Sequence, residues 1–350
     1  MSNDILARYP GLIGRPQAMA LMCRALIARG LHADAYALGR AALTAAPDDT
    51  VVRDLVQSYL RKDVPGFHIR MLRDYARNAA YAAAIARQVK PGMRVLDIGT
   101  GAGLLALLAA RAGAQVVTCE ANPMIAAAAC KIVARNGFAD RITVVAKRST
   151  DLVVGVDLPE RCDLLVSEIF GDDMVEEGVV PSLRDACARL LVPGAAIVPP
   201  RVELRCALVM HERLERLERE GLDDVMGFDL SPFAVLTRPE RFLTPFSKGH
   251  AALRSDAVSA MRIDFECVID TPADRIVLTS NGGRVDGIAH WMRIDFGDGV
   301  TYENTPFGDP HAHWLVPVHG FFAPRQTAAG EVIAADVRVL GDKLVISAAA

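Results

Sequence analysis

The chain has 350 residues, of which 51% are hydrophobic and 23% are charged. This composition is typical of a folded protein with sizeable cores and excludes an intrinsically disordered chain. The most apolar run, residues 104–117, is interrupted by Arg111 and is too short to cross a bilayer. The first thirty residues lack the charged start, apolar stretch and cleavage site of a secretory signal. We therefore expect a cytoplasmic protein with no membrane contact.

Charge is distributed unevenly along the chain. Residues 1–90 carry 13 Lys or Arg against 7 Asp and no Glu, whereas the remaining residues carry 26 basic and 35 acidic side chains. An acidic body of this kind suits a basic substrate and disfavours nucleic acid as a partner. Solvated surfaces with no binding role would give the same imbalance.

The seven cysteines indicate neither a disulfide framework nor a metal site. They are scattered, odd in number and never spaced as Cys-x-x-Cys. We expect reduced, buried thiols and no bound metal at Cys23, Cys119, Cys130, Cys162, Cys187, Cys206 and Cys267.

Residues 1–62 are predicted to be a helical N-terminal segment. The expected helices within 17–60 are broken at Arg29-Gly30 and at Pro47-Asp48-Asp49, because Gly ends a helix and Pro-Asp-Asp begins one. Small and turn residues recur with the spacing of a single tetratricopeptide-like hairpin, at Gly30, Ala35, Ala42 and Pro47. One such unit cannot bury its apolar face alone, so we expect it to pack on the next domain. It is either a partner-binding repeat or a simple helical cover.

Residues 63–199 are predicted to form an α/β domain with a doubly wound parallel sheet. Short β-branched or Leu-rich runs alternate there with helical stretches, which favours parallel β-α-β units. The expected strands are 95–98, 116–119, 142–145, 164–166 and 195–198.

Residues 200–350 are predicted to form an antiparallel β domain, sandwich or barrel, because strand-like alternation and turns replace the helices. The expected strands are 202–209, 260–269, 276–280, 290–296 and 332–346. Residues 211–245 interrupt them with the charged sequence HERLERLERE and a proline-punctuated segment. This insertion is either an arm that contacts another subunit or a solvated excursion.

The segment VLDIGTGAGLL indicates a cofactor loop. It places Asp97 near a strand end, ahead of Gly99, Gly101 and Gly103, which open a helix. Glycines let the backbone approach a ligand closely. The spacing departs from the G-x-G-x-x-G of dinucleotide sites and matches that of S-adenosylmethionine enzymes. Glu120 ends the next strand, where a carboxylate can accept both hydroxyls of a ribose.

The segment after the fourth expected strand is strongly acidic. Residues 168–177 contain five acids and no Lys or Arg. Because ligands bind outside the carboxyl ends of parallel strands, these carboxylates are expected to attract a cation. A guanidinium fits, since it stays charged up to a pKa of ~13.8 and offers paired donors to carboxylates. A solvated acidic turn is the alternative interpretation.

Taken together, these motifs resemble the protein arginine methyltransferases. VLDIGTGAGLL, Glu120, SEIFGDDMVEE and His313-Trp314 follow one another as in that family, whose acidic hairpin carries two Glu nine positions apart, as Glu168 and Glu177 are here. The resemblance spans residues 67–346, and STDLVVG with SEIFGDDMVEEG is nearest to the subgroup with monomethylating, type III, members. It implies a Rossmann-like class I methyltransferase fold followed by a β-barrel, with S-adenosylmethionine as the cofactor.

The resemblance also implies roles for single residues. Glu168 and Glu177 would clamp the guanidinium of an arginine in a protein or peptide, and His313 would pair with Asp74 to relay the released proton. The remaining implied roles are cofactor binding by Arg77, Asp97, Gly99, Gly101, Gly103, Glu120, Ser149 and Thr150, and substrate binding by Met71 and Trp314.

The sequence departs from the family at three places. Ser149 and Thr150 stand where many relatives present a Val-Glu pair to the adenine, and Ala312 replaces a Thr before His313. The Tyr-Phe pair usually found upstream of His68 is missing. We therefore expect adenine recognition and the lid over the cofactor to differ from those of most relatives.

Methyl transfer from a sulfonium to nitrogen is an in-line displacement, so orientation of the acceptor is expected to supply about 7–11 kcal/mol of the barrier reduction. Two other functions stay open: methylation of a small guanidino or amine compound, and a non-catalytic interaction protein. The intact set of acids disfavours the second. Because 350 residues hold one catalytic module, and the insertion at 211–245 is rich in apolar residues, we expect a homodimer.

Overall fold

The computed structural model describes residues 3–61, 64, 66–212, 222–236, 242–244, 247, 249–265, 274–341 and 343–348. The chain divides into two compact units. The first comprises Met1–Arg70, Ile85–Glu168 and Asp185–Ala195, and the second comprises Met71–Ala84, Ile169–Arg184 and Ala196–Ala350. The second unit therefore takes two segments from the middle of the chain in addition to the C-terminal strands.

Helices form the N-terminal part of the first unit. They are α1 (Asn3–Arg8), the 3-10 helix η1 (Pro10–Leu12), α2 (Pro16–Ala28), α3 (His32–Ala45) and α4 (Thr50–Leu60). Both predicted breaks are confirmed. Gly30 has a φ of +73° between α2 and α3, a left-handed conformation that favours Gly. The Asp49 carboxylate accepts hydrogen bonds from the N–H groups of Val51 and Val52, which caps α4.

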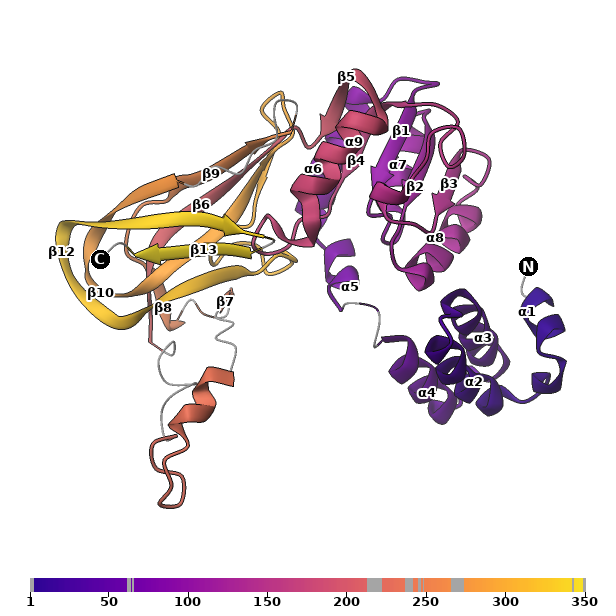
Figure 1. Cartoon of the computed structure of the whole chain (residues 1–350), viewed down its shortest axis with the longest axis horizontal. Helices are drawn as coiled ribbons and strands as arrows, with labels where there is room; N and C mark the ends of the chain where they lie inside the picture. Colours follow the sequence, from indigo (N-terminus) through magenta and orange to yellow (C-terminus); the bar gives the residue numbers. More distant parts are fainter. Residues whose placement is uncertain are drawn as a thin grey trace. The chain divides into compact units, whose positions relative to one another are not determined.

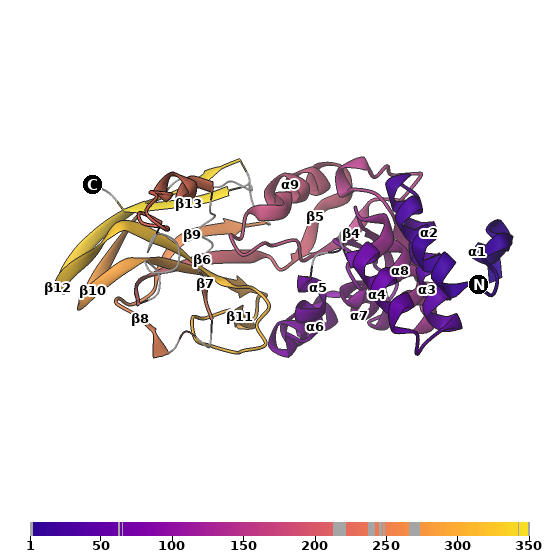
Figure 2. The ribbon, with the colours of Figure 1, turned by 90° about the horizontal axis from the view of Figure 1, so that it is seen from below.

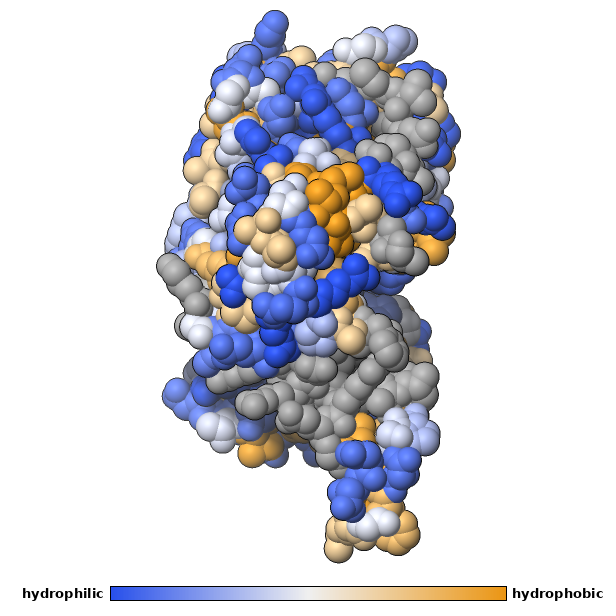
Figure 3. Space-filling view, turned by 90° about the vertical axis from the view of Figure 1, so that its left-hand side faces the viewer, coloured by the Kyte–Doolittle hydropathy of each residue, from blue (hydrophilic) through white to orange (hydrophobic). Residues whose placement is uncertain are grey.

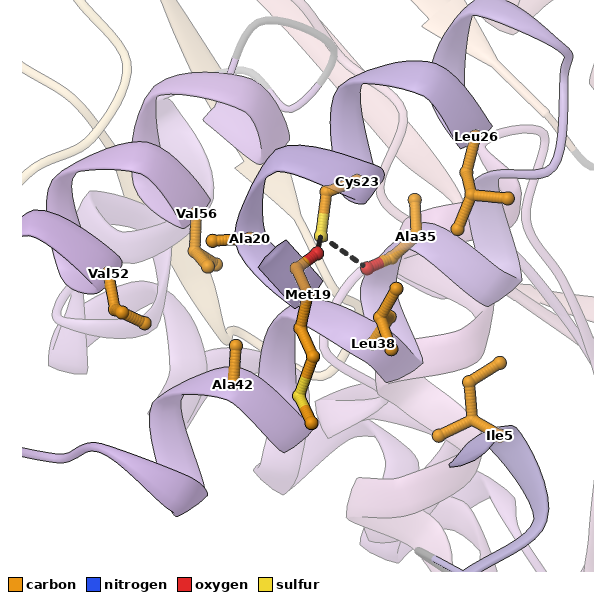
Figure 4. Packing of buried hydrophobic residues seen from close by; sticks show 10 residues of the cluster. All are labelled: Ile5, Met19, Ala20, Cys23, Leu26, Ala35, Leu38, Ala42, Val52 and Val56. Atoms are coloured by element: carbon orange, nitrogen blue, oxygen red, sulfur yellow. Dashed lines mark hydrogen bonds between the residues drawn. The ribbon is translucent and has the colours of Figure 1, made fainter. Parts of the chain in front are cut away.

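These helices share one apolar core, shown in Figure 4, in which Cys23 of α2, Leu38 of α3 and Val56 of α4 are all buried. Gly39 permits this close packing, because a Cβ at that position would lie 3.1 Å from Val56 and 3.4 Å from the sulfur of Cys23. Helix α3 also contacts α8 (Pro123–Arg135). The helical segment therefore does pack on the following domain.

A parallel sheet with strand order β3-β2-β1-β4-β5 forms the remainder of this unit (Figure 1). Its strands are β1 (Arg94–Ile98), β2 (Gln115–Cys119), β3 (Ile142–Val145), β4 (Cys162–Ser167) and β5 (Leu191–Val198). Helices α5 (Phe67–Leu72) and α6 (Tyr75–Gln88) precede β1, α7 (Leu104–Arg111) and α8 follow β1 and β2, and α9 (Val179–Arg189) precedes β5. The expected parallel α/β sheet is confirmed, although β5 begins at Leu191 rather than at 195.

The second unit is built on an antiparallel sheet with strand order β13-β12-β10-β6-β8, to which β11, β9 and β7 add through β10, β6 and β12. Figures 1 and 2 show β10 and β12 as long, curved ribbons. The strands are β6 (Arg201–His211), β7 (Phe242–Leu243), β8 (Ala251–Leu253), β9 (Val258–Asp264), β10 (Asp274–Asp295), β11 (Thr301–Glu303), β12 (Val316–Leu340) and β13 (Lys343–Ala348). An antiparallel domain after the α/β domain is therefore confirmed.

Two strand predictions are corrected. The expected strands 276–280 and 290–296 are parts of the single strand β10, because the residues between them stay paired with β12 through two register shifts. Gly282 and Gly283, with φ of +91° and +92°, lie in that stretch without ending the strand. The expected strand 332–346 is two strands joined at Gly341, whose φ is +68°. Part of the expected strand 260–269, residues 266–269, lies outside the described residues.

The insertion expected at 211–245 is described only in part. Residues 213–221, and with them most of HERLERLERE, lie outside the described residues. The described portion contains the 3-10 helix η5 (Ser231–Leu236) and exposes Met226 (93%), Phe228 (69%) and Phe233 (64%). In Figure 3 this segment protrudes at the lower edge of the molecule, with hydrophobic side chains at its tip.

Within the described ranges, no helix is both long and apolar enough to cross a membrane. The same ranges contain no group of three or more His, Cys, Asp or Glu side chains arranged to hold a metal ion. Six cysteines, Cys23, Cys119, Cys130, Cys162, Cys187 and Cys206, are free thiols. Cys130 and Cys187 are exposed, which corrects the expectation of buried thiols at these two positions. The seventh, Cys267, lies outside the described residues.

Candidate active site

The glycine loop of the first unit has the backbone that its sequence predicts. Gly99, Gly101 and Gly103 have φ values of +87°, +49° and +82°, all in the left-handed region that other residues rarely adopt. Gly103 is the residue before α7, so the loop leads from β1 directly into a helix N-terminus. Asp97 is almost fully buried, and its Oδ2 accepts a hydrogen bond of 2.7 Å from the Thr118 hydroxyl on β2. Strand pairing therefore fixes the carboxylate beneath the loop.

Glu120 lies directly after β2 and ties the glycine loop to it. Its Oε2 accepts a hydrogen bond of 3.0 Å from the N–H of Gly101, and its Oε1 accepts one of 2.9 Å from the N–H of Asn122. A carboxylate offers about four acceptor positions, so each oxygen can accept a further bond from a hydroxyl group. Glu120 therefore combines a loop-bracing role with the capacity to bind a ribose.

His68, for which the sequence interpretation gave no role, shares this environment. Its Nδ1 is buried and has no hydrogen-bond partner within the described residues. Burial lowers the pKa of His68, whereas the negative charge of Glu120 acts in the opposite direction. A neutral imidazole with a buried, unsatisfied nitrogen beside Glu120 fits a hydroxyl-bearing ligand. A signal was present in the sequence, because His68 lies three residues before Met71, to which the family resemblance gave a role.

The two residues expected near the adenine differ in exposure. Both lie in the 3-10 helix η3 (Ser149–Asp151), which follows β3. Ser149 is buried, whereas Thr150 is exposed and its carbonyl oxygen accepts a hydrogen bond of 3.0 Å from Arg189. The geometry therefore favours Ser149 over Thr150 as a ligand contact.

In the second unit, Asp74 is the centre of a buried polar cluster. The residue is fully buried, and its Oδ1 accepts a hydrogen bond of 3.0 Å from the N–H of Arg77 at the start of α6. Its Oδ2 lies 2.6 Å from the donating Tyr302 hydroxyl and 3.1 Å from His313 Nδ1. The expected pairing of His313 with Asp74 is present. Tyr302 was not anticipated, since its strand β11 was not among the predicted elements.

Asp74 is ionised in this setting. Burial acts to raise the pKa of its carboxyl, but hydrogen bonds from His313 and Tyr302 outweigh that effect, and the pKa lies below its usual range. Burial, and then the hydrogen bond to the same carboxylate, raises the pKa of the Tyr302 phenol, which therefore stays protonated and keeps donating. The cluster thus holds one negative charge that orients the His313 ring.

Arg77 is also buried, so it is not an ordinary helix-surface arginine. Its Nη1 donates a hydrogen bond of 2.8 Å to Asn78, and its guanidinium lies 4.9 Å from the ring centre of Tyr81. Met71, in the helix α5 that precedes this cluster, is half-buried, and its carbonyl oxygen accepts a bond from the N–H of Asp74. These residues therefore form one connected group.

The acidic hairpin after β4 is tied to the β domain by its inner acids. Asp172 Oδ1 accepts a hydrogen bond of 2.7 Å from the N–H of Leu315, and Glu176 Oε1 one of 2.6 Å from Lys343. The third inner acid, Asp173, lies 3.4 Å from His290 Nε2. Five acids were expected to attract a cationic ligand, but the protein supplies partners from the β domain for these three.

Trp314, the residue before Leu315, also anchors this hairpin. It is buried, and its Nε1 donates a hydrogen bond of 2.7 Å to the carbonyl oxygen of Phe170. Within the hairpin, Met174 and Glu177 have φ values of +64° and +59°, a conformation that non-glycine residues rarely adopt. Glu168, just after β4, is half-buried, and Glu177 is exposed. The contacts of Trp314 are those of a loop anchor, whereas the sequence interpretation gave it a substrate contact.

Comparison with known proteins identifies the relatives of the chain. The family described as Ribosomal protein L11 methyltransferase (PrmA) matches residues 81–198. An arginine N(omega)-methyltransferase of Streptomyces achromogenes subsp. streptozoticus is 35% identical over 80% of this chain and 78% of its own. Protein arginine N-methyltransferase 7 of Danio rerio is 31% identical over 84% of this chain, which spans only 47% of that relative.

Solved structures share the fold. The Trypanosoma brucei PRMT1 enzyme–prozyme heterotetrameric complex with AdoHcy matches 80% of this chain and 91% of its own with a TM-score of 0.70 at 23% identity. Arabidopsis thaliana protein arginine methyltransferase 10 matches 80% of this chain and 87% of its own with a TM-score of 0.63 at 21% identity. With the glycine loop, the Asp74–His313 pair and the acidic hairpin in place, the chain belongs to the S-adenosylmethionine-dependent arginine N-methyltransferase family.

Proposed function

We propose that the protein transfers a methyl group from S-adenosylmethionine to the guanidinium of an arginine in a protein or peptide. The observation that carries this proposal is the anchored acidic hairpin. Its inner acids are engaged by the β domain, Trp314 bonds the backbone of Phe170, and its two end glutamates stand nine positions apart. Paired carboxylates on a constrained loop suit a planar cation with several N–H donors.

For the cofactor, we propose that the glycine loop accommodates the methionine part and that Glu120 with His68 binds the ribose hydroxyls. The left-handed glycines, the acceptor capacity of Glu120 and the unsatisfied nitrogen of His68 support this assignment. Asp97, Ser149 and Thr150 complete the proposed set, and Arg77 would bind the cofactor carboxylate. When bound, the cofactor supplies an electrophilic methyl group.

Glu168 and Glu177 would hold the guanidinium edges that do not react, so that the remaining nitrogen is oriented for displacement. They would also stabilise the positive charge that the guanidinium keeps as the sulfonium charge disappears. The ionised Asp74 orients His313, which would take up the released proton. Met71 and Trp314 would shape the acceptor side of the site.

The test is the substitution Glu168→Gln. It removes the negative charge of one clamp residue without touching the glycine loop, so cofactor affinity should persist while transfer falls by at least about tenfold, as expected for loss of one charge-assisted contact. Calorimetry with S-adenosylmethionine and mass spectrometry of an arginine peptide measure the two quantities. Glu331→Gln, at an exposed position on β12, is the matched control. Turnover equal to that of the parent would refute the role of Glu168.

A second acceptor is favoured by one finding. The Streptomyces relative, which matches this chain over most of both lengths, is named for arginine rather than for protein arginine. The alternative function is therefore methylation of free arginine or another small guanidino compound. Competition between free arginine and an arginine peptide at equal concentration, read by isotope-labelled methyl transfer, decides between them. Preferential labelling of free arginine would show that free arginine, and not the peptide, is the substrate.

We further propose that the enzyme stops at monomethylarginine and acts as a homodimer whose arm, residues 211–245, contacts the second subunit. The resemblance to the monomethylating subgroup supports the product, and the exposed Phe228 and Phe233 support the contact.

We also propose that the antiparallel sheet closes as a barrel and that residues 1–62, 63–199 and 200–350 act as separate domains. The protein is proposed to be cytoplasmic, in keeping with its free thiols.

A further inference from the structure

A chain of three titratable side chains, none of which has a role in the proposed transfer, links the acidic hairpin to the β domain. His290 of β10 and His319 of β12 lie one diagonal step apart on the same face, since Ile288 pairs with His319 across the two strands. His319 Nε2 is 3.0 Å from His290 Nδ1, and His290 Nε2 is 3.4 Å from Oδ1 of Asp173. The chain therefore leads from the sheet to the hairpin.

Burial and the neighbouring side chains set the protonation of Asp173 and His319. His290 is fully buried, and the Asp173 side chain is 19% exposed. Burial lowers the pKa of His319 to about 3, so this imidazole is neutral. Burial acts to raise the pKa of the Asp173 carboxyl, but the facing His290 outweighs it and the pKa lies below its usual range. An ionised Asp173 thus faces an imidazole that is backed by a second, neutral imidazole.

The backbone next to Asp173 shows what this contact supports. Met174 follows it directly with a φ of +64°, and Glu177 has a φ of +59°. Non-glycine residues stay in this conformation only where the surrounding contacts fix them. Asp173 is the anchored residue immediately before the first of these two positions. Its contact with His290 is therefore placed to control the path of the hairpin toward Glu177.

We propose that Asp173, His290 and His319 form a positioning relay that sets where the acidic hairpin presents Glu177 to the acceptor guanidinium. The inference rests on the proposed function, because it assigns Glu177 to the acceptor. The three residues act through Glu177 and are positioning residues. They should affect acceptor binding and leave the glycine loop unaffected.

A double-mutant cycle between His290 and Glu177 tests the relay. Binding of an arginine peptide is measured by calorimetry in the presence of S-adenosylhomocysteine, for the parent, His290→Leu, Glu177→Gln and the double variant. His290→Leu should raise the peptide Kd by about tenfold in the parent, the range for loss of a contact to a charged group. In the Glu177→Gln background the same change should raise Kd less than about twofold. The KM for peptide should rise more than kcat falls.

A merely structural role gives a different result. The relay would be overturned if His290→Leu raised the peptide Kd by the same factor in the parent and in Glu177→Gln, or if it left the peptide Kd of the parent unchanged. Because His290 is fully buried, His319→Leu provides a second variant at a half-buried position, and it should give the same coupling to Glu177. His311→Leu, at an exposed position, is the matched control and should leave peptide binding unchanged. If the parent enzyme methylates no arginine substrate, the proposed function is contradicted. If the parent transfers methyl groups but the losses of binding free energy in the cycle are additive, only the relay is contradicted.

Discussion

Single residues in this protein often serve two purposes, and Asp74 is the clearest case. Its Oδ1 accepts the N–H of Arg77 and so caps α6, while its Oδ2 receives Tyr302 and faces His313 Nδ1. Residues more than two hundred positions apart in the chain are thereby held on one carboxylate. The hydrogen bond at Nδ1 orients the His313 ring.

Glu120→Ala should weaken the affinity for S-adenosylmethionine by about 1.5–3 kcal/mol, because it removes hydrogen bonds from a charged acceptor. It also releases the N–H groups of Gly101 and Asn122, so the glycine loop loses its brace. Calorimetry measures the change, with Glu160→Ala at an exposed position as the control. An unchanged dissociation constant would show that Glu120 serves only the loop.

The lowered pKa of His319 predicts that the protein loses stability in acid. Its pKa in the folded protein is about 3, far below the ordinary value of 6.5, so the unfolded chain takes up a proton that the folded chain does not. The neutral form is favourable above pH 6.5, and the free energy of unfolding should fall as pH decreases from 6.5 toward 3. Urea unfolding at several pH values should give a shallower decline for His319→Asn than for the parent. Parallel curves for the two proteins would contradict this expectation.

At the scale of elements, the acidic hairpin is defined by what surrounds it. Its inner acids are engaged by Lys343 of β13, His290 of β10 and the backbone of Leu315, and its first turn is held by Trp314. A carboxylate engaged by a neighbouring donor has fewer acceptor positions left for a ligand. Crowded acids in a sequence can therefore be partly structural, and only the neighbouring strands show which ones are.

Gly171→Ala should disturb this hairpin. A Cβ at Gly171 would overlap the side chain of Glu176, which bonds Lys343, so the hairpin would have to shift. We expect a loss of about 1–3 kcal/mol of stability, the usual effect of overpacking, and a higher KM for the acceptor with unchanged cofactor affinity. Denaturant unfolding and steady-state kinetics measure these quantities. Gly249→Ala, where a Cβ meets open space, is the control, and equal behaviour of the two variants would contradict the prediction.

At the scale of the whole molecule, the compact units do not follow the order of the chain. The segments Met71–Ala84 and Ile169–Arg184 belong to the unit of the C-terminal β domain, although both are flanked in sequence by parts of the first unit. The first segment carries Asp74 and Arg77, and the second carries the acidic hairpin from Ile169 onward, whereas Glu168 belongs to the first unit. Six proposed site residues belong to the second unit: Met71, Asp74, Arg77, Glu177, His313 and Trp314.

The exposed apolar side chains of the arm, residues 211–245, predict that the protein self-associates. Phe228 and Phe233 are exposed by 69% and 64%, and an exposed apolar run of this kind usually has a partner. Light scattering at micromolar concentration should give twice the mass of the chain, and the double variant Phe228→Ser with Phe233→Ser should give the mass of one chain. Val277→Ser, at an exposed apolar position on β10, is the control. A fully active parent that scatters as a monomer would refute the dimer.

The sequence by itself determined the features that depend on neighbouring residues. Helix breaks at Gly30 and Asp49, the parallel strands and the left-handed glycine loop follow from local backbone preferences and short-range periodicity. The resemblance to known enzymes added the Asp74–His313 pair, which the structure contains. The continuity of β10 did not follow from the sequence, because glycines within a strand and glycines in a turn give the same local signal.

Only the tertiary structure decided which polar side chains meet. Tyr302 joins Asp74, and His290 and His319 join Asp173, through strands that bring distant positions together. The five acids of the hairpin are equivalent in sequence, yet the β-domain partners of Asp172, Asp173 and Glu176 differ from one acid to the next. Ion pairs and hydrogen bonds depend on distances of a few ångströms between residues far apart in the chain, and such distances are set by strand register and packing rather than by any local pattern.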